Sequence, residues 1–137
     1  MTFYLDASVP IAVRTALASV REDIVYAGGP NAPKESTQDR HWLATVGREG
    51  WVVIKRDKRI RTRPWEREAL IAAGVRTFCL TGAGNYTRWD TLRLLTARWA
   101  RIEEVAASIP GPYIYSVTWE GVRALSLAGG KTAAKRR

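Results

Sequence analysis

Short apolar runs alternate along this chain with longer stretches in which apolar residues recur every three or four positions. Continuous apolar runs predict buried strands at residues 2–5, 24–26, 51–54 and 75–80. Residues 113–118 alternate between apolar and polar side chains, which predicts a last strand at an edge of the sheet.

Helical spacing predicts one helix in each interval between these strands. The second begins near Ser36 or Thr37 and ends at Gly47 or Gly50, the third begins at Pro64, and the fourth covers about residues 87–108. Their predicted inner faces are Val9, Val13, Leu17 and Val20; Trp42, Leu43 and Val46; Ala69, Leu70 and Ala73; and Trp89, Leu92, Leu95, Trp99, Ile102 and Ala106. Strands that alternate with helices predict an α/β fold, with a mainly parallel sheet and helices on both faces.

A chain of 137 residues favours one domain, and we expect it to cover residues 1–127, followed by a basic, disordered tail at 128–137. No apolar run approaches the roughly 18 residues of a membrane span. Asp6 interrupts the first apolar run, so we expect no signal peptide and a cytoplasmic protein. The single cysteine, Cys79, is expected to be a buried, reduced thiol.

The formal charge is +9, from 22 basic and 13 acidic residues. Four of the positive charges belong to the tail residues Lys131, Lys135, Arg136 and Arg137, and without these four the charge is still about +5. A basic protein favours nucleic acid or an acidic protein as its partner.

Two aspartates follow predicted strands, and a third opens a predicted helix. Asp6 follows the first strand, Asp57 comes shortly after residues 51–54, and Asp39 lies in the first turn of the second helix. If the two strands are parallel, Asp6 and Asp57 point into one crevice at the end of the sheet. Carboxylate oxygens are the ligands that Mg²⁺ or Mn²⁺ takes beside substrate phosphates. No sequence pattern of a zinc site is present.

Each aspartate also has a structural explanation. Asp6 can cap the helix that follows it, although Ser8 can do so instead. Asp39 can stabilise the positive end of a helix, and Glu35 competes with it as a ligand. Asp57 can pair with the cations around it.

Basic residues surround Asp57 on both sides. They are Lys55, Arg56, Lys58, Arg59, Arg61 and Arg63. One interpretation is a solvated turn, and the other is a set of phosphate contacts for nucleic acid beside the metal.

The segments 3–6, 37–43 and 51–58 resemble the three acid-bearing motifs of compact PIN-like domains, which include the VapC-type toxins of bacterial toxin–antitoxin modules. The resemblance covers residues 2–118. It implies a three-layer α/β sandwich and a metal-dependent endoribonuclease in which Asp6, Asp39 and Asp57 are catalytic and bind Mg²⁺ or Mn²⁺. It further implies an RNA substrate, a cognate antitoxin that inhibits the toxin, and a homodimer or a complex with the antitoxin. Because no apolar run is long enough to span a membrane, we also expect no membrane partner.

The sequence departs from the family pattern at two places. Arg59 replaces a further acid of the third motif, and residues 81–85 lack the fourth acid that many PIN domains carry. We therefore expect one metal ion rather than two. The alternatives are a non-catalytic PIN-fold module that binds RNA or protein, and a nuclease that acts on DNA, since the metal chemistry would be the same.

Overall fold

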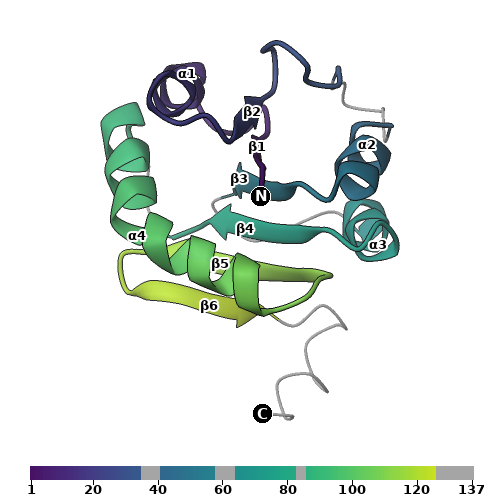
Figure 1. Ribbon diagram of the computed structural model, residues 1–137. Helices are drawn as coiled ribbons and strands as arrows, with labels where there is room; N and C mark the ends of the chain where they lie inside the picture. Colours follow the sequence, from purple (N-terminus) through teal and green to yellow (C-terminus); the bar gives the residue numbers. More distant parts are fainter. Residues whose placement is uncertain (35–40, 58–63, 83–85, 126–137) are drawn as a thin grey trace.

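The computed structural model describes residues 1–34, 41–57, 64–82 and 86–125. These residues form a six-stranded sheet in the order β2-β1-β3-β4-β5-β6 (Figure 1). The strands are β1 Phe3–Leu5, β2 Ile24–Tyr26, β3 Val52–Arg56, β4 Arg76–Leu80, β5 Tyr113–Thr118 and β6 Gly121–Leu125. The four pairs formed among β1 to β5 are parallel, and β6 is antiparallel to β5.

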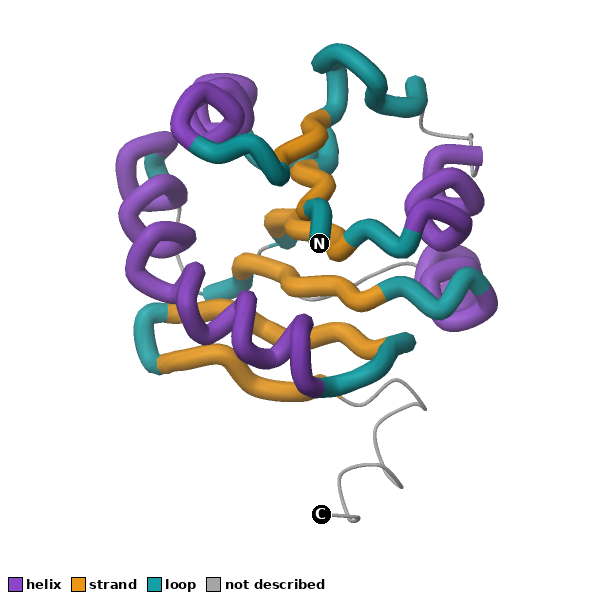
Figure 2. The backbone as a smooth tube through the Cα atoms, in the orientation of Figure 1, coloured by secondary structure: helices purple, strands orange, loops and turns teal. Residues whose placement is uncertain are grey.

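The helices are α1 Ile11–Val20, α2 His41–Glu49, α3 Pro64–Ala72 and α4 Arg88–Ser108. Helices α1 and α4 lie on one side of the sheet, and α2 and α3 lie on the other (Figure 1), so that helical layers flank the central strands (Figure 2). The predicted alternation of strands and helices and the predicted three-layer α/β architecture are confirmed. Gly50 and Gly74 follow α2 and α3 with φ angles of 71° and 70°, a conformation that favours glycine at helix ends.

Two hydrophobic cores fill the spaces between the sheet and its helical layers. Along β3, Val52 and Ile54 belong to the core beneath α1 and α4, whereas Val53 belongs to the core beneath α2 and α3. This alternation follows from the two-residue period of a strand, and burial on both faces explains its continuous apolar sequence. Cys79 on β4 is 1% exposed in the α2–α3 core, which confirms its predicted burial.

The prediction that residues 113–118 form an edge strand was wrong. Strand β5 lies between β4 and β6, and β6 forms the edge. The sequence of β6 reads Gly-Val-Arg-Ala-Leu, and each of its residues is half-buried or exposed. An edge strand that buries so little apolar surface leaves a weak pattern in the sequence.

Two residues predicted to lie on inner helix faces are exposed. Val20, the last residue of α1, is 77% exposed, and Trp89, the second residue of α4, is 66% exposed. Periodicity gives the angular position of a side chain around its helix. It does not show whether another element extends far enough to cover that turn.

Candidate active site

The carboxyl ends of β1 and β3 bring two of the predicted acids to one edge of the sheet. Leu5 pairs with Ile54, and the Asp6 amide donates to the Ile54 carbonyl at 3.1 Å. The Asp57 amide donates to the Leu80 carbonyl at 2.9 Å, so Asp57 directly follows the paired part of β3. The strand order reverses between β1 and β3, and parallel α/β sheets bind ligands at such a switch point.

Asp6 is held by the turn that follows β1. Its side chain is 6% exposed, and its Oδ1 accepts hydrogen bonds from the Ser8 amide at 2.9 Å and from the Ser8 hydroxyl. Ser8 Oγ in turn accepts a hydrogen bond from the Arg56 amide at 2.9 Å, and this bond connects the turn to the end of β3. The residue that caps α1 is Pro10, with no side-chain hydrogen bond. Neither Asp6 nor Ser8 is therefore the helix cap that the sequence suggested.

Two of the predicted nucleic-acid contacts, Lys55 and Arg56, belong to β3 itself and not to a loop after it. Successive strand residues face opposite ways, and Lys55 is 7% exposed. Arg56 donates from Nη1 to Thr91 Oγ1 at 3.1 Å and to the Tyr86 carbonyl at 3.4 Å, which connects β3 to the start of α4. Asp57 is half-buried beside them. The remaining predicted site residues, Asp39, Lys58, Arg59, Arg61 and Arg63, lie outside the described part of the chain.

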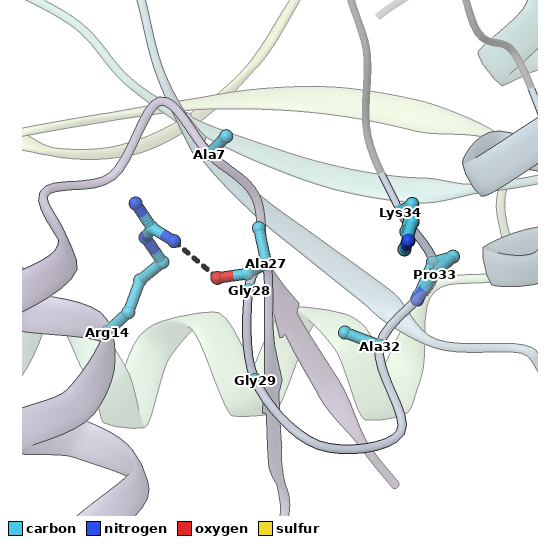
Figure 3. A pocket seen from close by; sticks show the side chains of 8 residues that line it. All are labelled: Ala7, Arg14, Ala27, Gly28, Gly29, Ala32, Pro33 and Lys34. Carbon is cyan, nitrogen blue, oxygen red and sulfur yellow. Dashed lines mark hydrogen bonds between the residues drawn. The ribbon is translucent and has the colours of Figure 1, made fainter.

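An open pocket of about 480 Å³ lies beside Ala7, the residue that follows Asp6 in the sequence (Figure 3). Its lining consists of Ala7, Arg14, Ala27, Gly28, Gly29, Ala32, Pro33 and Lys34. The Arg14 guanidinium donates to the Val9 carbonyl at 2.6 Å and to the Ala27 carbonyl, so it fastens α1 to the end of β2. Nothing in the sequence marks Arg14 or Lys34 as site residues, because a lone cation in a helix or a loop forms no pattern.

The donor atoms at this edge suit a hard divalent cation. Asp6 and Asp57 supply carboxylate oxygens, which Mg²⁺ and Mn²⁺ prefer. Within the described ranges, no cluster of three or more His, Cys, Asp or Glu side chains could hold a metal ion. Asp39, the third predicted ligand, lies outside those ranges, so the described residues supply two of the three predicted ligands.

A family model described as "PIN like domain" matches residues 1–82, which include β1, β3, Asp6 and Asp57. The chain belongs to the PIN-like domain family. The family assignment and the three-layer α/β fold agree with the resemblance of the acid-bearing segments.

Among curated proteins, the chain is similar to "Putative ribonuclease VapC45" of Mycobacterium tuberculosis, with 34% identity over 83 residues. The match covers 61% of this chain and 59% of that relative, so less than two thirds of the relative's length is spanned. No solved structure matches the chain. In the part of the chain that the structure describes, every helix is too short or too polar to cross a membrane.

Proposed function

We propose that this PIN-like protein is the toxin of a type II toxin–antitoxin pair, a metal-dependent endoribonuclease that cleaves cellular RNA and thereby inhibits translation and growth. The observation that carries the proposal is the position of Asp6 and Asp57, which follow adjacent parallel strands at the switch point of the sheet. The name of the mycobacterial relative supports ribonuclease activity, and the charge of +9 supports a polyanionic substrate.

In this proposal Asp6, Asp39 and Asp57 hold one Mg²⁺ or Mn²⁺ ion. When bound, the ion would supply the Lewis acidity that favours phosphodiester hydrolysis. Ser8 positions Asp6, because its amide and hydroxyl both donate to Oδ1 and so fix the rotamer of a buried carboxylate.

The basic residues act on the RNA backbone. Arg56, Lys58, Arg59, Arg61 and Arg63 are the proposed phosphate contacts, and such contacts set the position of a nucleic acid without reading its sequence. Lys55 belongs to the predicted set, but it is buried at the end of β3. Lys34, which lines the pocket beside Ala7, would add a further cation for the RNA backbone.

The test is cleavage of total cellular RNA by the purified protein with Mn²⁺, Mg²⁺ or EDTA. Asp6→Asn, Asp39→Asn and Asp57→Asn should each slow cleavage by about 100-fold or more, a loss typical of removing a charge-stabilising group from an active site. Glu104→Gln is the matched control, because Glu104 is an exposed acid on α4 that pairs with Arg101 at 2.8 Å. It should cleave like the wild type.

Discrete fragments that require metal and disappear in the three Asn variants would support the proposal. Equal, metal-independent degradation by all variants would indicate a contaminating nuclease. RNA binding without cleavage would favour the non-catalytic PIN-fold module. The sequence of residues 81–85, which contains no acid, also favours that alternative. Cleavage restricted to DNA would favour the alternative nuclease.

The proposed partner is a cognate antitoxin in the cytoplasm, since VapC-type PIN proteins work in such pairs and a basic surface attracts an acidic segment. Expression of the wild-type chain by itself should arrest growth, and expression of Asp6→Asn should not. Harmless expression of an active nuclease, together with the absence of a co-purifying protein from the native host, would contradict the toxin assignment.

A further inference from the structure

A group of aromatic residues lies on the same edge of the sheet as the proposed active site. Tyr86 and Trp89 stand at the start of α4, and Trp119 stands in the two-residue turn between β5 and β6. Because β3, β4 and β5 are parallel, the turn after β5 lies on the edge where Asp57 follows β3. In Figure 1 the β4 arrowhead and the β5–β6 turn lie on the same side.

The cluster is ordered by contacts within the fold. The rings of Tyr86 and Trp119 meet edge to face, with centroids 6.5 Å apart, and the Arg93 guanidinium lies 5.0 Å from the centre of the Trp119 ring. Trp89 is four residues before Arg93, which places it on the same face of α4. The Tyr86 hydroxyl donates to the Thr81 carbonyl at 2.8 Å.

The two tryptophan rings are nevertheless open to solvent. Trp89 is 66% exposed and Trp119 is 37% exposed, although tryptophan is a residue that folding usually buries for the most part. Exposed aromatic rings flanking an arginine form the kind of surface on which nucleic-acid bases stack, since every base has a π face and a cation favours the adjoining phosphates.

The charges and the connection to β3 favour nucleic acid. Arg88 and Arg93 are exposed at the start of α4, and Arg98 donates to the Thr118 carbonyl at 3.1 Å beneath the turn. Asp90 accepts a hydrogen bond from Arg93 at 3.3 Å and another from the amide of Thr87, the residue that caps α4, so part of its charge is offset. Glu120 is the second acid near the cluster. Basic side chains outnumber acidic ones near the cluster. The Arg56 guanidinium also connects β3 to the cluster, because it donates to the Tyr86 carbonyl.

We propose that Trp89 and Trp119, together with Tyr86 and Arg93, form a platform on which bases of single-stranded RNA stack beside the catalytic edge. This inference rests on the proposed ribonuclease function and deepens it. Adjacent strands lie about 4.8 Å apart, so the platform beyond β5 stands roughly 10 Å from the end of β3. It would hold nucleotides that flank the cleaved bond and would favour unpaired RNA, whose bases are accessible for stacking.

The test measures binding of fluorescently labelled single-stranded oligoadenylate of about 12 nucleotides, with EDTA present so that no cleavage occurs. Trp89→Ala should weaken binding about 5- to 150-fold, since each base stack is worth roughly 1–3 kcal/mol. Trp89→Phe should keep most of the affinity. Val20→Ala is the matched control, because it shortens a side chain that is also highly exposed, at the end of α1.

Two further measurements separate stacking from charge and from misfolding. Trp89→Ala should bind inorganic polyphosphate, which has no bases, as well as the wild type does, and its thermal midpoint should be unchanged. Trp119→Ala should lose RNA affinity in the same way. Equal RNA binding by the wild type and both alanine variants would overturn the platform, as would a wild type that binds no RNA, or a parallel loss of polyphosphate binding.

The platform and the proposed function fail in different experiments. RNA binding that depends on Trp89, with no metal-dependent cleavage, would remove the nuclease and keep the platform. If cleavage depends on Asp6 but RNA binding does not change in Trp89→Ala, the nuclease proposal stands and the platform is wrong. The exposed rings would then be assigned to a protein partner.

Discussion

Arg21 shows how one residue can join elements that are far apart in the sequence. Its guanidinium contacts Asp23 and Glu103 at 2.8 and 2.7 Å and lies 5.1 Å from the centre of the Trp99 ring. It thereby links the end of α1 to the segment before β2 and to α4. The hydrogen bond from Arg21 holds the pKa of Asp23 below its ordinary value of 3.8, although partial burial acts in the opposite direction.

The lowered pKa makes part of the stability dependent on pH. A carboxyl whose pKa is lower in the folded state stabilises the fold above its ordinary pKa, and this contribution disappears as the pH falls through the lowered value. Asp23→Asn should therefore reduce the free energy of unfolding at pH 7 by up to about 1 kcal/mol, as expected for a partly exposed pair. Urea unfolding at a series of pH values measures this difference.

At strongly acidic pH, wild type and Asp23→Asn should have the same stability. Glu104→Gln, which removes an exposed acid with no link between elements, should give little difference at any pH. A stability difference for Asp23→Asn that stayed constant into acid would assign its effect to packing and not to charge.

At the scale of the element, the contact between α2 and α3 depends on a glycine inside a helix. A Cβ atom at Gly47 would stand 2.7 Å from the Ala73 carbonyl oxygen and 2.8 Å from Ala73 Cβ. The sequence suggested Gly47 or Gly50 as the end of α2, and Gly47 lies within the helix while Gly50 follows it. The close approach of Ala73, the residue directly after α3, explains the glycine at position 47, which is not a helix-end signal.

We expect Gly47→Ala to destabilise the protein by roughly 1–3 kcal/mol, as overpacking does. The sign of this change in stability is informative, because helix propensity alone would make alanine about 1 kcal/mol more stabilising than glycine at an exposed helix position. Ala44→Gly, at an exposed position of α2, is the control and should cost about that amount through helix propensity. Chemical denaturation measures both, and a Gly47→Ala variant more stable than wild type would show that α3 can shift at little cost.

At the scale of the whole molecule, positive charge and the carboxyl edge of the sheet act together. The pocket lined by Ala7 and Ala27 lies at the ends of β1 and β2, the two acids follow β1 and β3, and the proposed aromatic platform lies beyond β4 and β5. A single-stranded polyanion could cross this edge and meet all three. The four basic residues of the tail would add attraction that does not depend on RNA sequence.

Deleting residues 128–137 should therefore make RNA binding less dependent on salt and leave the cleavage positions unchanged. The slope of log affinity against log salt should fall in magnitude by at most about 3, if all four tail cations contact phosphates of a single strand. A tail with Lys131, Lys135, Arg136 and Arg137 changed to Gln should reproduce the deletion. Cleavage at new positions would show instead that the tail selects the site.

Local patterns in the sequence determined the elements that build this protein. Apolar runs identified β1 to β4, alternation of apolar and polar residues identified β5, and helical spacing identified four helices, because burial imposes a pattern on each segment by itself. The same local reasoning placed Asp6 at the end of a strand and Asp57 close after another. The same reasoning wrongly predicted burial of Val20 and Trp89. Both have the helical spacing of inner residues, but both are exposed.

Tertiary structure decided which of these segments meet. The position of β1 between β2 and β3 places Asp6 and Asp57 after adjacent parallel strands, and the pairing of β6 with β5 forms the turn that carries Trp119 beside Tyr86 and Arg93. These contacts join residues tens of positions apart, and a periodic pattern within one segment contains no information about its partner. Strand order and the packing of helices on the sheet supply that information, because they fix which side chains share an edge.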